Sequence, residues 1–275
     1  DVIDGDLGDD RLYGGEGDDQ ILGGRGNDTI VGGAGDDAID GGIGNDRIWG
    51  DYDAAGGPGE DGADRIEGGS ENDLICGGGA NDVINGGRGN DTIAGDAGDD
   101  AIHGDSGNDT LYGGAGGDTL YGDCGSDSLY GQDGNDTLIA GIAAQVGSPT
   151  YVGDAETTHV LDGGAGNDWI YGDLGTDTVN AGDGDNTVMT FAGNDEIRSG
   201  SGNDYIDAGA GDDVITVTGG NNTIYGREGS ETVSTGAGND WIDLRSAAAE
   251  PSSTHTVTSA GGDNVIHTDD GDDAI

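Results

Sequence analysis

The sequence predicts an all-β fold, a parallel β-roll (β-solenoid) in which two short repeats form each coil. Three observations predict this fold. The chain of 275 residues repeats a nine-residue pattern, G-G-x-G-x-D-x-U-x, where U is a large aliphatic residue. Position eight is Ile, Leu or Val from unit to unit, and position six is Asp in most units. Strict self-similarity at a short period is typical of solenoids.

Each unit has two halves that predict different local structures. From Gly14 the units read GGEGDDQIL, GGRGNDTIV, GGAGDDAID and GGIGNDRIW, with no residue between them. The three glycines permit the positive φ angles of a tight turn and let carbonyl groups point at a common centre. The last three residues form a short strand that places U on one face. Because one strand cannot bury that side chain alone, we expect two parallel sheets with the U residues between them.

The charge of the chain restricts both its folding and its partners. Asp and Glu number 57, the 8 basic residues are all Arg, and the formal net charge is -49. A compact chain of this charge repels itself, so the chain is disordered or folds with bound cations, and the regular repeat argues against disorder. Nucleic acid is excluded as a partner by the sign of the charge. The apolar runs are too short to span a membrane, and Asp1 to Asp4 show no signal peptide.

The aspartates at position six predict a metal-binding edge on each side of the roll. Stacking brings the carboxylates of units n and n+2 together, where they would repel one another without a cation. Carboxylate and carbonyl oxygens, in a repeat without sulfur or imidazole, select Ca²⁺ over zinc or copper. We expect many calcium ions, about one per regular repeat. The candidate carboxylate ligands are Asp10, Asp19, Asp28, Asp37, Asp46, Asp64, Asp73, Asp82, Asp91, Asp100, Asp109, Asp118, Asp127, Asp136, Asp168, Asp177, Asp195, Asp204, Asp213 and Asp240.

Interruptions of the pattern divide the chain into three predicted regions. Residues 1–139 form a regular roll with a loop insertion at 50–58. Residues 140–162 hold an irregular insertion and a degenerate coil. Residues 163–275 continue the roll with degraded calcium sites and an insertion near 244–258. Asn replaces Asp at position six in Asn186, Asn222 and Asn264. Because an amide carries no charge, we expect fewer ions in this region than in the first.

The histidines are not expected to form a functional site. His159 and His255 occupy position six of the degenerate units DAETTHVLD and EPSSTHTVT. We expect these coils to lack calcium and to bulge outward, with outward or loop positions for His103 and His267 also. The sequence contains no H-E-x-x-H motif, no nucleophile elbow and no Lys for a phosphate loop, so we expect no enzymatic activity, no catalytic residues and no organic cofactor.

The units GGEGDDQIL, GGRGNDTIV and GGRGNDTIA resemble the glycine-rich nonapeptide repeats of RTX (repeats-in-toxin) proteins, and the resemblance covers nearly the whole chain. It implies a right-handed parallel β-roll that is unfolded without calcium. It also implies an extracellular protein, secreted or at the cell surface, exported by a bacterial type I system. In that family the turn glycines supply carbonyl ligands beside the position-six carboxylate. The matching glycines are Gly15, Gly17, Gly24, Gly26, Gly33, Gly35, Gly42, Gly44, Gly87, Gly89, Gly98, Gly107, Gly114, Gly116, Gly164 and Gly166.

Three functions remain open at this point. The leading one is a calcium-binding extracellular structural module, a rod whose folding is triggered by calcium. The second is a calcium-dependent filament or S-layer protomer in which copies of the chain stack end to end, because an uncapped roll exposes strand edges. The third is an adhesion module whose outer sheet face and loops at Gly50 and Ala140 bind a glycan or another surface partner. Exposed rings of Tyr112, Tyr130 and Trp49 would favour it. Stacked aromatics that merely support the sheet are the stronger interpretation of these tyrosines.

Overall fold

The structure is a computed structural model that describes residues 1–51, 61–141, 157–246, 253–268 and 273–275. The described residues form β-strands and no helix. They therefore contain no helix that is long and apolar enough to cross a membrane. Two compact units are present, Asp1–Gly134 and Asn135–Ile275. Most of the predicted insertions at 50–58 and 140–162, and residues 247–252 of the one near 244–258, lie outside the described residues.

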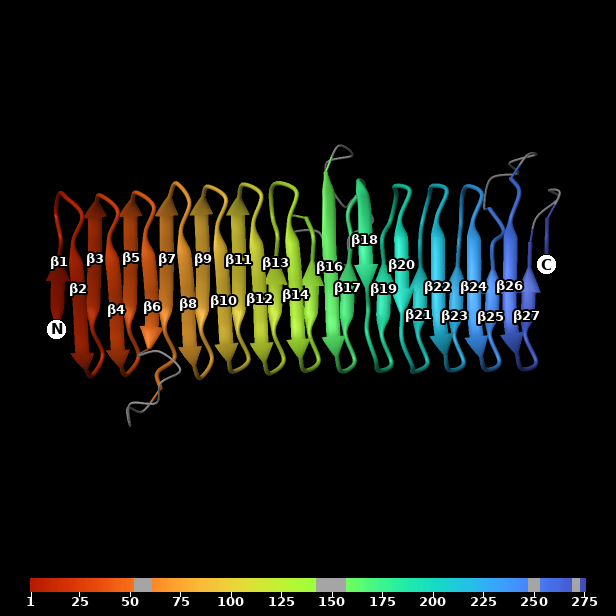
Figure 1. Ribbon diagram of the computed structural model, residues 1–275, viewed down its shortest axis with the longest axis horizontal. Coiled ribbons are helices and arrows are strands. Elements are labelled where there is room, and N and C mark those ends of the chain that lie inside the picture. The colour runs from red at the N-terminus through yellow and green to blue at the C-terminus, as the bar shows by residue number, and fades with distance from the viewer. Residues whose placement is uncertain (52–60, 142–156, 247–252, 269–272) are drawn as a thin grey trace. The chain divides into compact units, whose positions relative to one another are not determined.

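The first unit consists of two parallel sheets whose strands alternate along the chain (Figure 1). Successive units of the repeat therefore belong to opposite sheets, as predicted. One sheet has the order β1 (Val2–Asp4), β3 (Gln20–Arg25), β5 (Ala38–Ile43), β7 (Arg65–Ser70), β9 (Val83–Arg88), β11 (Ala101–Ser106), β13 (Thr119–Tyr121). The other has the order β2 (Arg11–Glu16), β4 (Thr29–Ala34), β6 (Arg47–Asp51), β8 (Leu74–Gly79), β10 (Thr92–Ala97), β12 (Thr110–Ala115), β14 (Ser128–Asp133).

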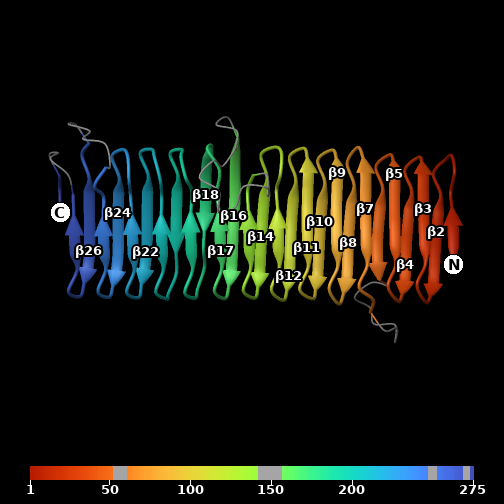
Figure 2. The ribbon, with the colours of Figure 1, turned by 180° about the vertical axis from the view of Figure 1, so that it is seen from behind.

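The second unit has the same alternation, which can be followed from behind in Figure 2. One sheet has the order β15 (Thr137–Ile139), β17 (Trp169–Tyr171), β19 (Thr187–Met189), β21 (Tyr205–Asp207), β23 (Thr223–Tyr225), β25 (Trp241–Asp243), β27 (Val265–His267). The other has the order β16 (Thr158–Ala165), β18 (Thr176–Asn180), β20 (Glu196–Ser199), β22 (Val214–Gly219), β24 (Thr232–Ala237), β26 (Thr256–Gly261). The predicted all-β parallel solenoid is confirmed in both units.

The strand register follows the repeat. Ile21 pairs with Ile39, and Ile30 pairs with Ile48, so position eight faces position eight two units further along the chain. The register survives the longer spacing of the first insertion, because Ile39 pairs directly with Ile66. An additional stretch of chain between two strands therefore leaves the pairing of the position-eight residues unchanged.

The position-eight side chains form the core between the two sheets of each unit. Ile84, Leu120 and Ile206 have no solvent-exposed surface, and most other residues at this position are equally buried. The residues before and after them in the strand point the other way, as the alternation of a strand requires. Burial of one aliphatic side chain per unit is thus the repeated apolar contribution to stability, worth about 2 kcal/mol for each residue.

Many strands are longer than the predicted three residues. In the regular coils they continue through the first three positions of the next unit, as β3 does through Gly23, Gly24 and Arg25. Gly24 has φ +102° and Gly26 has φ +139°, both in the region that favours glycine. A Cβ atom on Gly26 would also overlap the carbonyl oxygen of Gly8 in the adjacent coil. The glycines are required by backbone conformation and by close stacking together.

Replacement of one core residue tests this packing. We expect Ile84→Ala to lower the free energy of unfolding by about 2–5 kcal/mol, since it leaves a cavity between the sheets. The measurement is urea unfolding in saturating calcium, followed by circular dichroism.

Val83→Ala is the matched control, because Val83 precedes Ile84 in the same strand but is 39% exposed. We expect that change to cost well under about 1 kcal/mol. Equal losses for the two variants would contradict the assignment of the core.

Candidate calcium sites

The position-six side chains are buried, although they are carboxylates. The residues concerned lie on the turns between strands and have at most 5% of their surface exposed. They are Asp19, Asp28, Asp37, Asp46, Asp64, Asp73, Asp82, Asp91, Asp100, Asp109, Asp118, Asp127, Asp136, Asp168, Asp177, Asp195, Asp204, Asp213 and Asp240. Asp10, in an early coil, is the one predicted carboxylate ligand that is only half-buried. Charged groups are seldom buried without a partner, so these aspartates need a structural explanation.

In most of these carboxylates, one oxygen accepts a hydrogen bond from the backbone of the adjacent coil. The amide of Asp19 donates a hydrogen bond of 2.8 Å to Oδ1 of Asp37. The same bond joins the amide of Asp73 to Oδ1 of Asp91, and in the second unit the amide of Asp195 to Oδ1 of Asp213. The aspartates of each edge thus form a continuous ladder within their unit, which we call the carboxylate column. This ladder fixes the orientation of every side chain in it.

The other oxygen of the carboxylate has no hydrogen-bond partner. This Oδ2 atom is buried, and a buried carboxylate oxygen normally accepts a hydrogen bond from water or from a donor of the protein. These unsatisfied Oδ2 atoms are found in Asp10, Asp19, Asp28, Asp37, Asp46, Asp64, Asp73, Asp82, Asp91, Asp100, Asp109, Asp168, Asp213 and Asp240. Leaving one buried polar atom unpaired costs about 1–3 kcal/mol, and more for a charged group, so a column of them is strongly unfavourable without a cation.

A backbone carbonyl lies close to each unsatisfied oxygen. A Cβ atom built on Gly86 would lie 2.6 Å from Oδ2 of Asp91 and 3.0 Å from the carbonyl oxygen of Gly104. Gly104 has the same surroundings, with Oδ2 of Asp109 and the carbonyl oxygen of Gly122. In these coils a carboxylate oxygen and a carbonyl oxygen therefore converge on the space beside the glycine at position one, where a Cβ atom would overlap them. Hard oxygen donors of this kind fit a calcium ion.

The position-six carboxylates of adjacent coils are close enough to repel one another, as Asp91 and Asp46 do Asp73. A calcium ion in this column would have carboxylate oxygens and turn carbonyls as its available ligands. The glycines predicted to supply those carbonyls, such as Gly24 and Gly87, have positive φ angles in the same turns.

Burial makes the charged form of the column unfavourable when no cation is bound. Burial raises the pKa of Asp73 to about 8, and the neighbouring carboxylates of Asp91 and Asp46 add to this effect. The pKa of Asp82 is likewise raised to about 8, and that of Asp64 to about 7. Hydrogen bonds from backbone amides oppose the rise without cancelling it. At neutral pH, Asp64, Asp73 and Asp82 therefore favour either a bound proton or a bound metal cation.

The asparagines at position six donate hydrogen bonds to turn carbonyls that a calcium ion would otherwise bind. Nδ2 of Asn222 donates to the carbonyl oxygens of Gly219 and Gly220 at 3.2 Å, and Nδ2 of Asn264 donates to Gly261 at 3.2 Å. These carbonyls are then satisfied by an amide of the chain itself. The expectation of fewer calcium ions in the second unit stays a prediction, and these hydrogen bonds support it.

The expectation that His159 and His255 bulge outward is wrong. His159 is 2% exposed and lies in β16, and His255 is 1% exposed. Nδ1 of His255 lies 2.5 Å from a carboxylate oxygen of Glu231, which is also buried. His103 is half-buried and its Nδ1 lies 2.8 Å from Asp123. At these two positions a buried imidazole therefore lies beside a buried carboxylate, Asp173 for His159 and Glu231 for His255.

Sequence reasoning missed Asp173, which lies at position two of its unit and is 1% exposed. Other aspartates at position two, Asp96 and Asp105, are exposed and have positive φ angles. The sequence did contain an indication of this site. Asp173 replaces glycine at position two, and His159 replaces the position-six aspartate in the preceding coil.

Comparison with known proteins identifies the repeat. A family model described as the RTX calcium-binding nonapeptide repeat (4 copies) matches most of the chain. The matched residues are 1–30, 22–51, 58–93, 77–111, 94–129, 112–142, 160–188, 189–224, 210–242 and 256–275. No curated protein matches the sequence at a significant level.

One solved structure similar to this chain is a hyperactive, Ca²⁺-dependent, β-helical antifreeze protein from an Antarctic bacterium. The identity is 26% and the TM-score is 0.49. The match covers 88% of this chain and 66% of that chain, so this chain spans just under two thirds of the length of the antifreeze protein.

Removal of one charge from the column tests the calcium sites. We expect Asp91→Asn to keep the hydrogen bond from the Asp73 amide, to bind about one calcium ion fewer and to need more calcium to fold. The measurement is the calcium content by elemental analysis, together with a calcium titration followed by calorimetry.

Asp99→Asn removes the same charge from an exposed turn position whose Oδ1 accepts the amide of Gly117. An unchanged ion count is expected there, because an asparagine at this position keeps the acceptor, as Asn90 does for Asn108. Loss of an ion from both variants, or from neither, would contradict the site.

The pKa shifts predict how the metal-free chain responds to pH. From about pH 4 to pH 8 the folded state binds more protons than the unfolded state, so the free energy of unfolding falls as pH rises. We expect chain stripped of calcium on a chelating resin to contain more sheet near pH 5 than near pH 8, measured by far-UV circular dichroism. A sheet signal that increases with pH would show that the column is not the destabilising element.

Proposed function

The chain belongs to the RTX calcium-binding nonapeptide repeat family, and from that premise we propose that it is an extracellular structural module whose folding is triggered by calcium. The module would form part of a secreted or cell-surface bacterial protein. It would stay unfolded where calcium is scarce, as in the cytosol, and fold outside the cell. Because the ions bind the folded state, their binding free energy adds to the free energy of folding.

The observation that carries this proposal is the unsatisfied Oδ2 atom repeated along the carboxylate column. One isolated atom of this kind could be tolerated as local strain. A repeated row of buried carboxylate oxygens, each beside a backbone carbonyl, would oppose folding at every coil. A cation at each position removes this penalty, so the repeat itself makes folding depend on calcium.

The cationic side chains of the protein do not neutralise the column. All eight arginines are exposed on the outer surface. Several pair with carboxylates there, such as Arg65 with Glu67 and Arg245 with Asp243. These exposed ion pairs contribute little stability. The charge of the column is therefore balanced by protons or by cations from solution.

The stoichiometry follows from the positions of the ligands. About one ion for each regular repeat would be bound by a position-six carboxylate and by turn carbonyls such as those of Gly24 and Gly26. The second unit would bind fewer ions, because the amides of Asn222 and Asn264 already donate to turn carbonyls.

The adhesion alternative is less well supported. Its proposed platform included Tyr112 and Tyr130, which are half-buried and stack on each other with ring centroids 5.0 Å apart. Trp49 is also half-buried. The two tyrosine rings stack across adjacent strands of one sheet, and this contact covers part of the surface that a sugar would need. End-to-end assembly into filaments is the remaining alternative, and the experiment below distinguishes it.

A calcium titration tests the proposed function. We expect far-UV circular dichroism of the full chain to change cooperatively from coil to sheet as calcium is added at neutral pH. Light scattering recorded in parallel should stay constant for a monomeric module and increase if filaments form.

Magnesium is the matched control, because it demands a small octahedral site and retains its water ligands. It should not induce the transition at the same concentration. A full sheet signal in chelator at neutral pH would refute calcium-triggered folding.

A further inference from the structure

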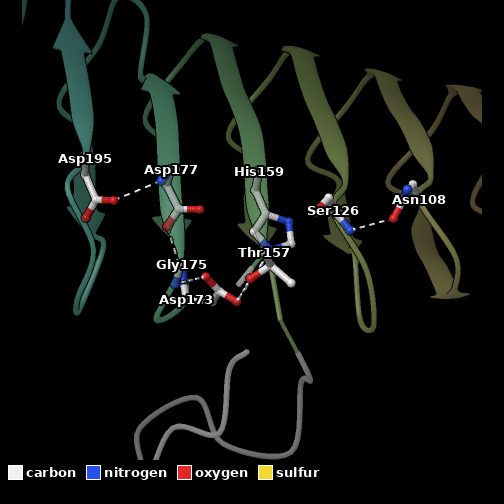
Figure 3. Close-up of polar contacts among 8 residues, drawn as sticks. All are labelled: Asn108, Ser126, Thr157, His159, Asp173, Gly175, Asp177 and Asp195. Atoms are coloured by element: carbon white, nitrogen blue, oxygen red, sulfur yellow. Dashed lines mark hydrogen bonds and ion pairs between the residues drawn. The ribbon is translucent and has the colours of Figure 1, made fainter. Parts of the chain in front are cut away.

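Three metal-binding side chains converge at one point inside the second unit (Figure 3). His159 comes from β16, Asp173 from the turn that follows β17, and Asp177 from β18. One ligand atom from each lies within 4.8 Å of the other two, and all three residues are buried. His159 pairs directly with Asp177 across the two strands, at the position where other coils place two carboxylates.

Asp173 is held in one orientation by two hydrogen bonds. The hydroxyl of Thr157 donates to Oδ2 at 2.7 Å, and the amide of Gly175 donates to Oδ1 at 2.6 Å. Oδ2 also faces Nε2 of His159 (Figure 3). Hydrogen bonds of this kind orient the carboxylate ligands of metal sites before the ion binds.

Asp177 supplies a carboxylate oxygen that the protein leaves unsatisfied. Its Oδ2 accepts the amide of Asp173 at 3.0 Å, and its own amide donates to Oδ1 of Asp195 at 2.9 Å. Its Oδ1 is buried and has no hydrogen-bond partner. The side chain is therefore fixed by the fold, with one acceptor atom available within the cluster.

The spacing of the ligand atoms suits a small ion. Nε2 of His159 lies 3.5 Å from Oδ2 of Asp173, which is longer than the usual N–H···O hydrogen bond of about 2.7–3.2 Å. Two ligands of a tetrahedral ion, each bonded at about 2.0–2.1 Å, are separated by about 3.4 Å. The observed spacing is therefore compatible with two ligands of one ion.

The chemistry of the donors separates this cluster from the calcium column. Calcium requires six to eight oxygen ligands, whereas this cluster offers an imidazole nitrogen and two carboxylates that are already partly hydrogen-bonded. Imidazole with carboxylate is a donor set suited to zinc and similar ions. We propose that Nε2 of His159, Oδ2 of Asp173 and Oδ1 of Asp177 form a binding site for a zinc-type divalent cation, distinct from the calcium sites. Such an ion would tie β16 and β18 together in a coil where histidine replaces the position-six carboxylate.

The test uses the full chain, folded in saturating calcium, and titrates it with Zn²⁺ by calorimetry. We expect about one tight equivalent of zinc per chain and an increase in the melting temperature. Co²⁺ in place of zinc should give the visible absorption of a tetrahedral ion with a nitrogen ligand. His159→Gln should weaken zinc binding by more than about tenfold and abolish the cobalt spectrum, and Thr157→Val should weaken binding by about tenfold.

His103→Gln is the matched control, because His103 also faces a carboxylate, that of Asp123 at 2.8 Å, but lies outside this cluster. Zinc binding should be unchanged in that variant. If His159→Gln does not fold in calcium, Asp173→Asn provides the same test and should also lose the zinc. The proposal is overturned if the calcium-loaded chain binds no tight zinc, if His159→Gln binds it equally well, or if added calcium displaces the zinc.

Discussion

The structure depends on one interaction, the hydrogen bond from a position-six amide to the position-six carboxylate of the adjacent coil. This bond recurs along the edges of both units, for example from Asp19 to Asp37 and from Asp195 to Asp213. It fixes the distance between coils and buries the carboxylate, and in doing so it directs the second oxygen into the turn. The strands, the aliphatic core and the glycines all accommodate this ladder. Under the proposed function, folding and cation binding are one process in this chain.

The regular part of the fold could be predicted from the sequence because each position of the repeat has one physical task. Ile84 and its equivalents are apolar at every ninth residue, and they are buried as predicted. The position-six aspartates were identified by the same periodicity. Strand length was underestimated, because glycines such as Gly23 and Gly24 usually weaken strands. Here stacking on identical glycine turns outweighs that intrinsic preference.

The interruptions of the repeat could not be predicted in the same way. A histidine at position six gives no repeating pattern, so its orientation depends on the particular residues beside it. His159 lies inside because Asp173 turns inward and the amide of Asp173 holds the Asp177 carboxylate in place. Asp96, at the same position two as Asp173, instead faces outward with a positive φ angle. One residue type at one repeat position thus adopts two conformations, and only the three-dimensional neighbours decide between them.

The direct pairing of Ile39 with Ile66 has a consequence for protein engineering. The strands that hold these residues remain neighbours although an additional stretch of chain separates them. Val233 and Val257 are likewise paired across a longer stretch than the regular repeat provides. The energy of the pairing resides in the strands and turns, and each doubling of a connecting loop costs only about 0.6 kcal/mol. The solenoid should therefore accept foreign peptides or small domains grafted at these junctions, as a scaffold that displays them at fixed intervals.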